Sequence, residues 1–220
     1  MTTSNHTALY RFEFPTKPVD GSPLSPLILL DLSDLWESRQ NATITVDPAT
    51  ARMTGNGTFL PSFGSGYYVL HFCADFLGAP VRDTGIFVND RGGSEPKSIF
   101  ITRGINLFNL VGGGWASFNA PTFNNTITAR VGVSFVSSAQ ACHNAEQEIP
   151  DFEFDQVRKN AEDAWRKKLS PVSIEPGGAS TELQTIFYSG IYRNFMSPQD
   201  YTGENPLWKS TEPYFDSYYW

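Results

Sequence analysis

Two hydrophobic patterns divide the chain near Val136. Before that point, short apolar runs with strand propensity alternate with turn signals, at a spacing typical of an antiparallel β-sandwich. The run from Tyr67 to Phe76 is apolar on both faces, as a central strand should be, and 126–136 alternates strongly. We expect the other strands over 9–14, 26–33, 42–47, 84–90 and 97–103. The turns that separate them are predicted at Pro48, 55–57, 90–93 and 112–114.

Helical signals follow Val136. Ser137 and Gln140 match a capping box, which predicts a short helix to about Glu148, before Pro150. A second helix is predicted over 155–169, because apolar residues recur every four positions and form one stripe. The members of the stripe are Val157, Ala161, Trp165 and Leu169. Acidic residues precede this helix and 166–168 is basic, as the helix dipole favours.

A third helix is predicted from Thr181, which opens a second capping-box pattern, to about Met196. Its apolar residues cover most of its circumference: Leu183, Ile186, Phe187, Tyr188, Ile191, Tyr192 and Phe195. Such a helix must be buried on most sides, so we expect its packing partners to lie outside this chain. The aromatic run over 214–220 would leave a large exposed apolar surface at a domain end. We therefore expect a fragment that continues beyond Trp220.

Composition and charge narrow the function classes. The net charge is −7 and no Lys/Arg block occurs, which argues against a nucleic-acid partner. No apolar run reaches the length of a membrane span, and the first residues lack signal-peptide features, so we expect the true start upstream of Met1. Aromatic residues make up 14% of the chain, which suits a sandwich core and also suits stacking on sugar rings.

Four glycosylation sequons, at Asn5, Asn41, Asn56 and Asn124, indicate secretion and predict glycosylated surface turns. Cys73 lies in a predicted strand and Cys142 in a predicted helix. The two cysteines could pair, but the sequence does not give their separation. Because buried free cysteines are common, we favour two free thiols.

Carboxylates are the residues that would carry hydrolysis of a sugar bond. Asp151, Glu153 and Asp155 form a cluster that could bind calcium, although their place at a helix start explains them better. Glu204 and Asp216 lie in aromatic, Gly/Pro-broken sequence and are weak candidates for substrate binding, with capping or solvated carboxylates as the blander interpretation. No spacing of His and Cys matches zinc, and no serine-hydrolase elbow occurs. The glycines at 112–114 precede Trp115 without the Gly-Lys-Ser/Thr of a phosphate loop, so a hairpin turn is favoured.

The stretch from Ala129 to Pro198 resembles the domain junction of glycoside hydrolase family 92, and the tail is similar to fungal α-1,2-mannosidases of that family. The residues that carry the resemblance are 130–137, Gln140-Ala141, Asn144, 148–150, Phe154-Asp155, Ala164-Trp165, Glu175, Phe187-Tyr188, 197–204 and 215–219. The resemblance implies a secreted, calcium-dependent, inverting exo-α-mannosidase acting on mannose-containing glycans such as N-glycan branches. It also implies an N-terminal sandwich followed by an (α/α)₆ barrel.

The same resemblance places no catalytic residue in this chain. The acid, the base and the calcium ligands are expected beyond Trp220, and a sugar-binding loop is expected before Met1. We therefore predict a mainly β fold with α: a partial β-sandwich over 1–137, a helical linker over 138–170, and the start of a truncated (α/α)₆ catalytic domain over 171–220. The chain alone should be inactive. The alternative from another class is a non-catalytic carbohydrate-binding or structural sandwich with a helical tail.

Overall fold

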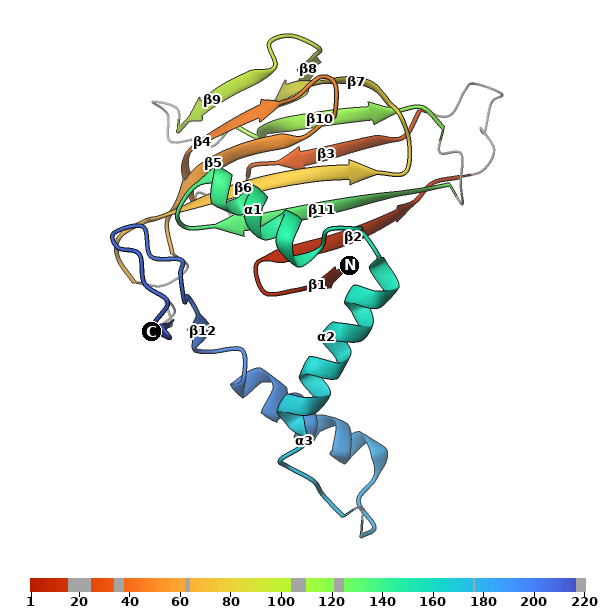
Figure 1. Ribbon diagram of the computed structural model, residues 1–220, viewed down its shortest axis with the longest axis vertical. Helices are drawn as coiled ribbons and strands as arrows, with labels where there is room; N and C mark the ends of the chain where they lie inside the picture. The colour runs from red at the N-terminus through yellow and green to blue at the C-terminus, as the bar shows by residue number, and fades with distance from the viewer. Residues whose placement is uncertain are drawn as a thin grey trace.

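The computed structural model describes residues 1–15, 25–33, 38–61, 64–103, 110–120, 125–175 and 177–216. Two antiparallel sheets face each other in the described part, with three helices and a small hairpin attached (Figure 1). The larger sheet has the order β1 (Thr2–Thr3), β2 (Thr7–Glu13), β11 (Thr126–Ser134), β6 (Tyr68–Leu77), β5 (Met53–Phe59), β4 (Arg39–Val46), β9 (Ser98–Thr102). The smaller sheet has the order β3 (Leu27–Asp31), β10 (Gly112–Phe118), β7 (Val81–Val88), β8 (Arg91–Gly93). The predicted fold class, a mainly β chain with an antiparallel sandwich, is confirmed.

The core lies between the sheets, where alternate residues of each strand point inward. Ile44, Met53 and Phe72 of the larger sheet meet Ile86 and Phe118 of the smaller one. Seven strands nevertheless face only four, so part of the larger sheet is covered less closely. A cleft of about 450 Å³ opens there between β3 and the strands β2, β11 and β6, with mainly apolar lining. The core of the sandwich is therefore open along this side.

Two glycine clusters predicted as turns lie inside strands instead. Gly55 and Gly57 belong to β5, and Gly112, Gly113 and Gly114 belong to β10, in the middle of the smaller sheet. A Cβ at Gly55 would come within 2.8 Å of the Phe72 ring, and one at Gly114 within 2.8 Å of Ile44. Glycine is needed at these positions because neighbouring side chains occupy the space of a Cβ. Strands β1 and β8 were also not predicted.

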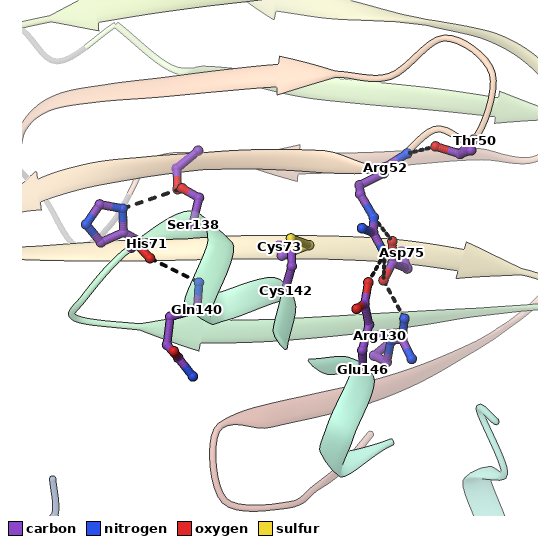
Figure 2. Close-up of a disulfide and its surroundings, with 12 residues drawn as sticks. Thr50, Arg52, His71, Cys73, Asp75, Arg130, Ser138, Gln140, Cys142 and Glu146 are labelled. Atoms are coloured by element: carbon purple, nitrogen blue, oxygen red, sulfur yellow. Dashed lines mark hydrogen bonds and ion pairs between the residues drawn. A yellow bond between two sulfur atoms is a disulfide. The ribbon is translucent and has the colours of Figure 1, made fainter. Parts of the chain in front are cut away.

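A disulfide holds helix α1 (Ser138–Glu148) on the outer face of the larger sheet, which corrects the expectation of two free thiols (Figure 2). Cys73 of β6 and Cys142 of α1 have Cα atoms 5.0 Å apart. Gly132 of β11 makes this approach feasible, since a Cβ there would lie 2.3 Å from the Ala141 carbonyl oxygen. Only a close backbone-to-helix contact brings the two sulfurs within bonding range.

Beside the disulfide, charged residues join the larger sheet to α1 (Figure 2). Asp75 accepts from Arg52 at 2.6 Å and from Arg130 at 2.6 Å, and Arg52 also reaches Glu146 of α1 at 2.6 Å. The buried Arg130 also donates to the Ile149 carbonyl at 2.6 Å. Its charge is therefore paired and hydrogen-bonded, as burial requires.

The helices begin close to the predicted positions. The Ser137 hydroxyl accepts from the Gln140 amide, as in a capping box, but the Gln140 side chain donates to Asn144 rather than back to the cap. Helix α2 spans Phe154–Leu169. Helix α3 spans Thr181–Asn194, and its N-cap is Ser180 rather than Thr181.

Helix α3 buries none of its residues. Leu183 is 58% exposed and Ile186 is 68% exposed, and α3 touches the rest of the described chain mainly through α2. The sequence-based expectation that this helix lacks its packing partners agrees with these exposures. After α3, β12 (Gln199–Asp200) and β13 (Phe215–Asp216) form a small hairpin.

Candidate functional site

A hollow lies where the sandwich, the helices α2 and α3, and strand β12 come together. It encloses about 670 Å³. Its lining includes His6 from the turn between β1 and β2, Trp165 and Lys168 from α2, Tyr192 from α3, and Asp200 from β12. Aromatic surface and groups of both charges meet here, which is the mixture found in sites for polar ligands.

Helix α2 is held at a fixed angle to the sandwich by its first turns. Val157 is buried in a small cluster with Leu9 and Ile149. The Arg11 guanidinium lies 4.3 Å from the Phe154 ring centroid and 3.3 Å from the Asp155 carboxylate. Further along α2, the Trp165 and Tyr192 rings are 4.4 Å apart and make the main contact with α3.

His6 lines the hollow on the sandwich side and is bound to Glu148. Nδ1 of His6 lies 2.7 Å from Oε1 of Glu148, whose carboxylate also accepts from the His6 amide at 2.9 Å and from Ser4 at 2.5 Å. Burial alone would raise the pKa of Glu148, but these hydrogen bonds outweigh it and lower the pKa to about 2. The bond to Glu148 raises the pKa of His6, against a smaller opposing effect of burial. The pair therefore ties the β1–β2 turn to the end of α1.

Glu204 is buried, with only 6% of its surface exposed. Its Oε2 accepts from the Ser134 hydroxyl at 2.7 Å and the Phe135 amide at 2.8 Å, and its Oε1 accepts from the Asn144 amide group at 3.0 Å. These three donors satisfy the carboxylate inside the protein. The structure thus gives Glu204 a positioning role, in which it anchors the C-terminal hairpin to β11 and α1.

Asp216, the other predicted candidate, lies on β13 and is half-buried. Its Oδ2 accepts from the Tyr214 hydroxyl at 2.8 Å. Neither Asp216 nor Glu204 is among the described residues that line the hollow, so the structure does not gather the predicted residues into that site. Substrate binding by either residue stays a prediction.

The acidic residues Asp151, Glu153 and Asp155 lie at the start of α2, where the helix dipole favours negative charge. Asp155 lies in the first turn, and Asp151 accepts weakly from the Glu153 amide at 3.5 Å. Within the ranges that the structure describes, no group of three or more His, Cys, Asp or Glu residues could hold a metal ion. Calcium therefore has no fitting ligand set among these residues.

Both parts of the chain match one family. A model described as the glycosyl hydrolase family 92 N-terminal domain matches residues 1–134, and the family 92 catalytic domain matches residues 140–219. The chain belongs to glycosyl hydrolase family 92. The resemblance drawn from the domain junction is thereby confirmed.

Relatives place this family 92 chain within longer proteins. It is 50% identical over 222 residues to an "uncharacterized secreted glycosidase" of Arthroderma benhamiae, covering all of this chain and 29% of that protein. The solved GH92 family glycosyl hydrolase ccman5 is 23% identical with a TM-score of 0.76, covering 98% of this chain and 28% of that one. The inverting mannosidase BT2199 of Bacteroides thetaiotaomicron is 22% identical with a TM-score of 0.68, covering 89% of this chain and 24% of that one. At these identities the solved structures show the fold.

The sequons differ in their settings. Asn5 is exposed in the turn between β1 and β2 and lines the hollow. Asn41 and Asn56 lie within β4 and β5 and are half-buried, so they are not in turns as predicted. Asn124 falls outside the described residues. No helix of the described residues is long and apolar enough to cross a membrane.

Sequence reasoning missed the pairs that fix this junction. His6 was not singled out, and its partner Glu148 was noted only as a helix end. Asn144, which reaches both the Val133 carbonyl and Glu204, was noted only as part of the resemblance. Asn144 and Glu204 lie 60 positions apart and His6 and Glu148 lie 142 apart, and neither spacing nor periodicity links residues so distant.

Proposed function

We propose that this chain is part of a secreted, calcium-dependent, inverting exo-α-mannosidase that removes terminal mannose from α-linked glycans such as N-glycan branches. The observation that carries the proposal is the match of both family 92 domains along one chain. The names of solved relatives, one of them an inverting mannosidase, support mannose as the sugar. The secreted glycosidase of A. benhamiae supports secretion.

In this proposal the chain supplies the frame of the junction rather than the reacting groups. Inverting hydrolysis needs an acid and a base on opposite sides of the sugar bond, roughly 6.5–9.5 Å apart. The buried carboxylate of Glu204 already accepts three hydrogen bonds, and Glu148 is held ionised by His6, so neither is suited to donate a proton. We place the acid, the base and the calcium ligands of the longer enzyme outside these residues.

In this proposal the chain contributes to the reaction by orienting α2 and α3, on which the rest of the catalytic domain would pack. Helix α3 presents Leu183, Ile186 and Phe187 to solvent, and further helices of a barrel would cover them. The Glu204 anchor and the His6–Glu148 pair would then hold that barrel against the sandwich. Positioning of this kind matters because displacements of about 1 Å can cost a hundredfold in rate.

A domain exchange tests the proposal. The 222 matching residues of the A. benhamiae glycosidase would be replaced by this chain, which is 50% identical to them. We expect the hybrid to release mannose from an α-1,2-mannobioside, with the β-anomer appearing first in proton NMR spectra and with loss of activity in EDTA. The isolated 220-residue chain should release none.

The unexchanged relative is the control. If the hybrid folded but was inactive while the parent was active, this chain would not be able to serve as the junction of such an enzyme. If both proteins released another sugar, mannose would not be the sugar that the enzyme removes. If the α-anomer appeared first, the enzyme would retain the anomeric configuration instead of inverting it. Full activity in EDTA would show that the reaction does not require calcium.

A further inference from the structure

Trp115 lies at the centre of the outward face of the smaller sheet. Its neighbours across the strands are Leu29 of β3 and Gly85 of β7. Directly paired residues in a sheet point to the same face, so Trp115 and Leu29 share this surface. Leu29 is 56% exposed and Trp115 is half-buried. An aromatic ring thus sits on an open sheet surface instead of in the core.

Glycines form the floor beneath this ring. An ideal Cβ at Gly85 would lie 2.8 Å from Cε2 and Cζ2 of Trp115, and one at Gly92 would lie 3.7 Å from its Nε1. The indole Nε1 donates to the Ile86 carbonyl at 3.2 Å. The ring therefore extends from β10 across β7 with its single donor used. Because a side chain at Gly85 would displace it, the ring lies close against the backbone.

Polar acceptors flank the ring along the strands. Ser117 and Asp83 pair with each other two positions from Trp115 and Gly85, on the strands that the indole covers. The Asp83 side chain is 47% exposed, and its Oδ2 accepts from the Ser94 hydroxyl at 2.7 Å. Carboxylate and hydroxyl oxygens thus border a fixed aromatic surface.

We propose that this surface, the Trp115 platform (Trp115 with Gly85 and Gly92 beneath it), binds a pyranose ring of a glycan. The C–H face of the sugar stacks on the indole, and its hydroxyls donate to Asp83. The platform binds sugar without cleaving it. It therefore goes beyond the proposed hydrolase, whose reacting groups lie elsewhere.

The chemistry favours a sugar over a protein partner. The buried cores of protein interfaces are depleted of Asp, whereas the half-exposed Asp83 lies on this face of β7, two positions from Gly85. A sugar brings hydroxyl donors to such acceptors and an apolar face to the indole. The ring is already fixed by its bond to Ile86 and by the glycine floor, so little conformational freedom is lost on binding.

NMR titration of the ¹⁵N-labelled 220-residue chain tests this proposal. The probes are α-1,2-mannobiose, methyl α-mannoside and cellobiose. We expect saturable shifts of the Trp115 indole N–H and of the Gly85 and Gly92 amides, with a Kd on the order of 1 mM for at least one probe. W115A should weaken binding about tenfold or more. D83N should weaken it less, because it keeps the ring.

Trp208→Ala is the matched control. Trp208 is also an exposed tryptophan, at 57%, but it belongs to the C-terminal segment rather than to the smaller sheet. This variant should bind as the unaltered chain does. If W115A fails to fold, the shift pattern of the unaltered chain together with D83N decides the question. Three results would overturn the platform: no shift with any probe, shifts confined to Trp165 and Tyr192 in the hollow, or self-association that W115A abolishes. Binding by the isolated chain and hydrolysis by the hybrid enzyme are separate measurements, so either proposal can fail alone.

Discussion

The carboxylate of Glu204 accepts a hydrogen bond from the Ser134 hydroxyl at 2.7 Å, across 70 positions of sequence. Ser134 ends β11, and the other oxygen of Glu204 accepts from Asn144 of α1. One buried carboxylate therefore joins the sandwich, the first helix and the C-terminal hairpin. Its removal should affect the hairpin more than the sandwich.

We predict that Glu204→Gln loosens residues 197–216. The new amide nitrogen would face donors that now point at an oxygen, and hydrogen bonds to a charged group are worth roughly 1.5–3 kcal/mol. Hydrogen exchange should rise in the hairpin, with little change in β4 to β6. Asp216→Asn is the control, because Asp216 is half-buried and its carboxylate accepts from the Tyr214 hydroxyl, two positions away in the same hairpin. Unchanged exchange in E204Q would show that the aromatic contacts of Tyr201 hold the hairpin instead.

Much of the fold could be predicted from local sequence patterns, and the predictions that failed have a common cause. Apolar runs and caps located seven strands and three helices because these signals act within a few residues. The glycines of β5 and β10 were misjudged because their use depends on rings and carbonyls from other strands. The disulfide depends on the closeness of α1 to Gly132, which no spacing reveals.

The site was less predictable than the fold for the same reason. Glu204 and Asp216 were singled out by their aromatic surroundings in sequence, but burial and donors decided the role of Glu204. The His6–Glu148 pair spans 142 positions. Such pairs arise from topology, here from the pairing of β2 with β11 and the return of α1 over that sheet.

We predict that replacing both cysteines by alanine destabilises the chain by about 4 kcal/mol, the entropic value for a closed loop of this length. The disulfide joins Cys73 and Cys142 across 69 positions and restricts the unfolded chain. Urea unfolding of C73A/C142A, beside the oxidised and reduced forms of the unaltered chain, measures the loss. Reduction alone should lower the midpoint in the same direction. Equal stability of all three forms would mean that the Arg52–Asp75–Glu146 contacts suffice to hold α1.

The His6–Glu148 pair predicts a window of maximal stability in pH. Glu148 has a lowered pKa, so its contribution is present above the unfolded value of 4.5 and is lost as the pH falls toward 2. His6 has a raised pKa, so its contribution is present below 6.5 and is lost as the pH rises past that value. The pair should therefore stabilise most between 4.5 and 6.5. Urea midpoints should fall from pH 6 to pH 8.5, and His6→Gln should flatten that fall. A parallel fall in both proteins would assign it to other groups.

The two strand sequons lie opposite each other, and this predicts unequal glycosylation. The Thr58 hydroxyl of one sequon donates to the Asn41 side-chain oxygen of the other at 3.0 Å, and the backbone N–H of Asn56 donates to the Thr43 hydroxyl at 3.3 Å. Asn5 is exposed in a turn, so it should carry the most glycan. Peptide mass spectrometry after endoglycosidase treatment, on protein from the native host, gives the occupancies. Unmodified Asn5, Asn41, Asn56 and Asn124 together would count against secretion.

The last prediction concerns α3, whose apolar face is open. Leu183, Ile186 and Phe187 are 58%, 68% and 40% exposed, and burying a large apolar side chain is worth roughly 1.5–3 kcal/mol. Helix α3 therefore forgoes most of the stabilisation that its sequence could provide, while the sandwich has a packed core and a disulfide.

Limited trypsin digestion of the isolated chain should consequently cut first at Lys167, Lys168 or Arg193, which lie at the ends of α2 and α3. We expect a resistant fragment that ends near Leu169, because opening of α3 requires little free energy whereas cleavage within the sandwich requires disruption of its core. Mass mapping identifies the fragment, and light scattering in the same buffer reports the oligomeric state. If α3 and the sandwich were equally protected in a dimer, a second copy would cover α3. Equal protection in a monomer would mean that α3 packs on the sandwich, and the unfinished barrel would then be the wrong description of this chain.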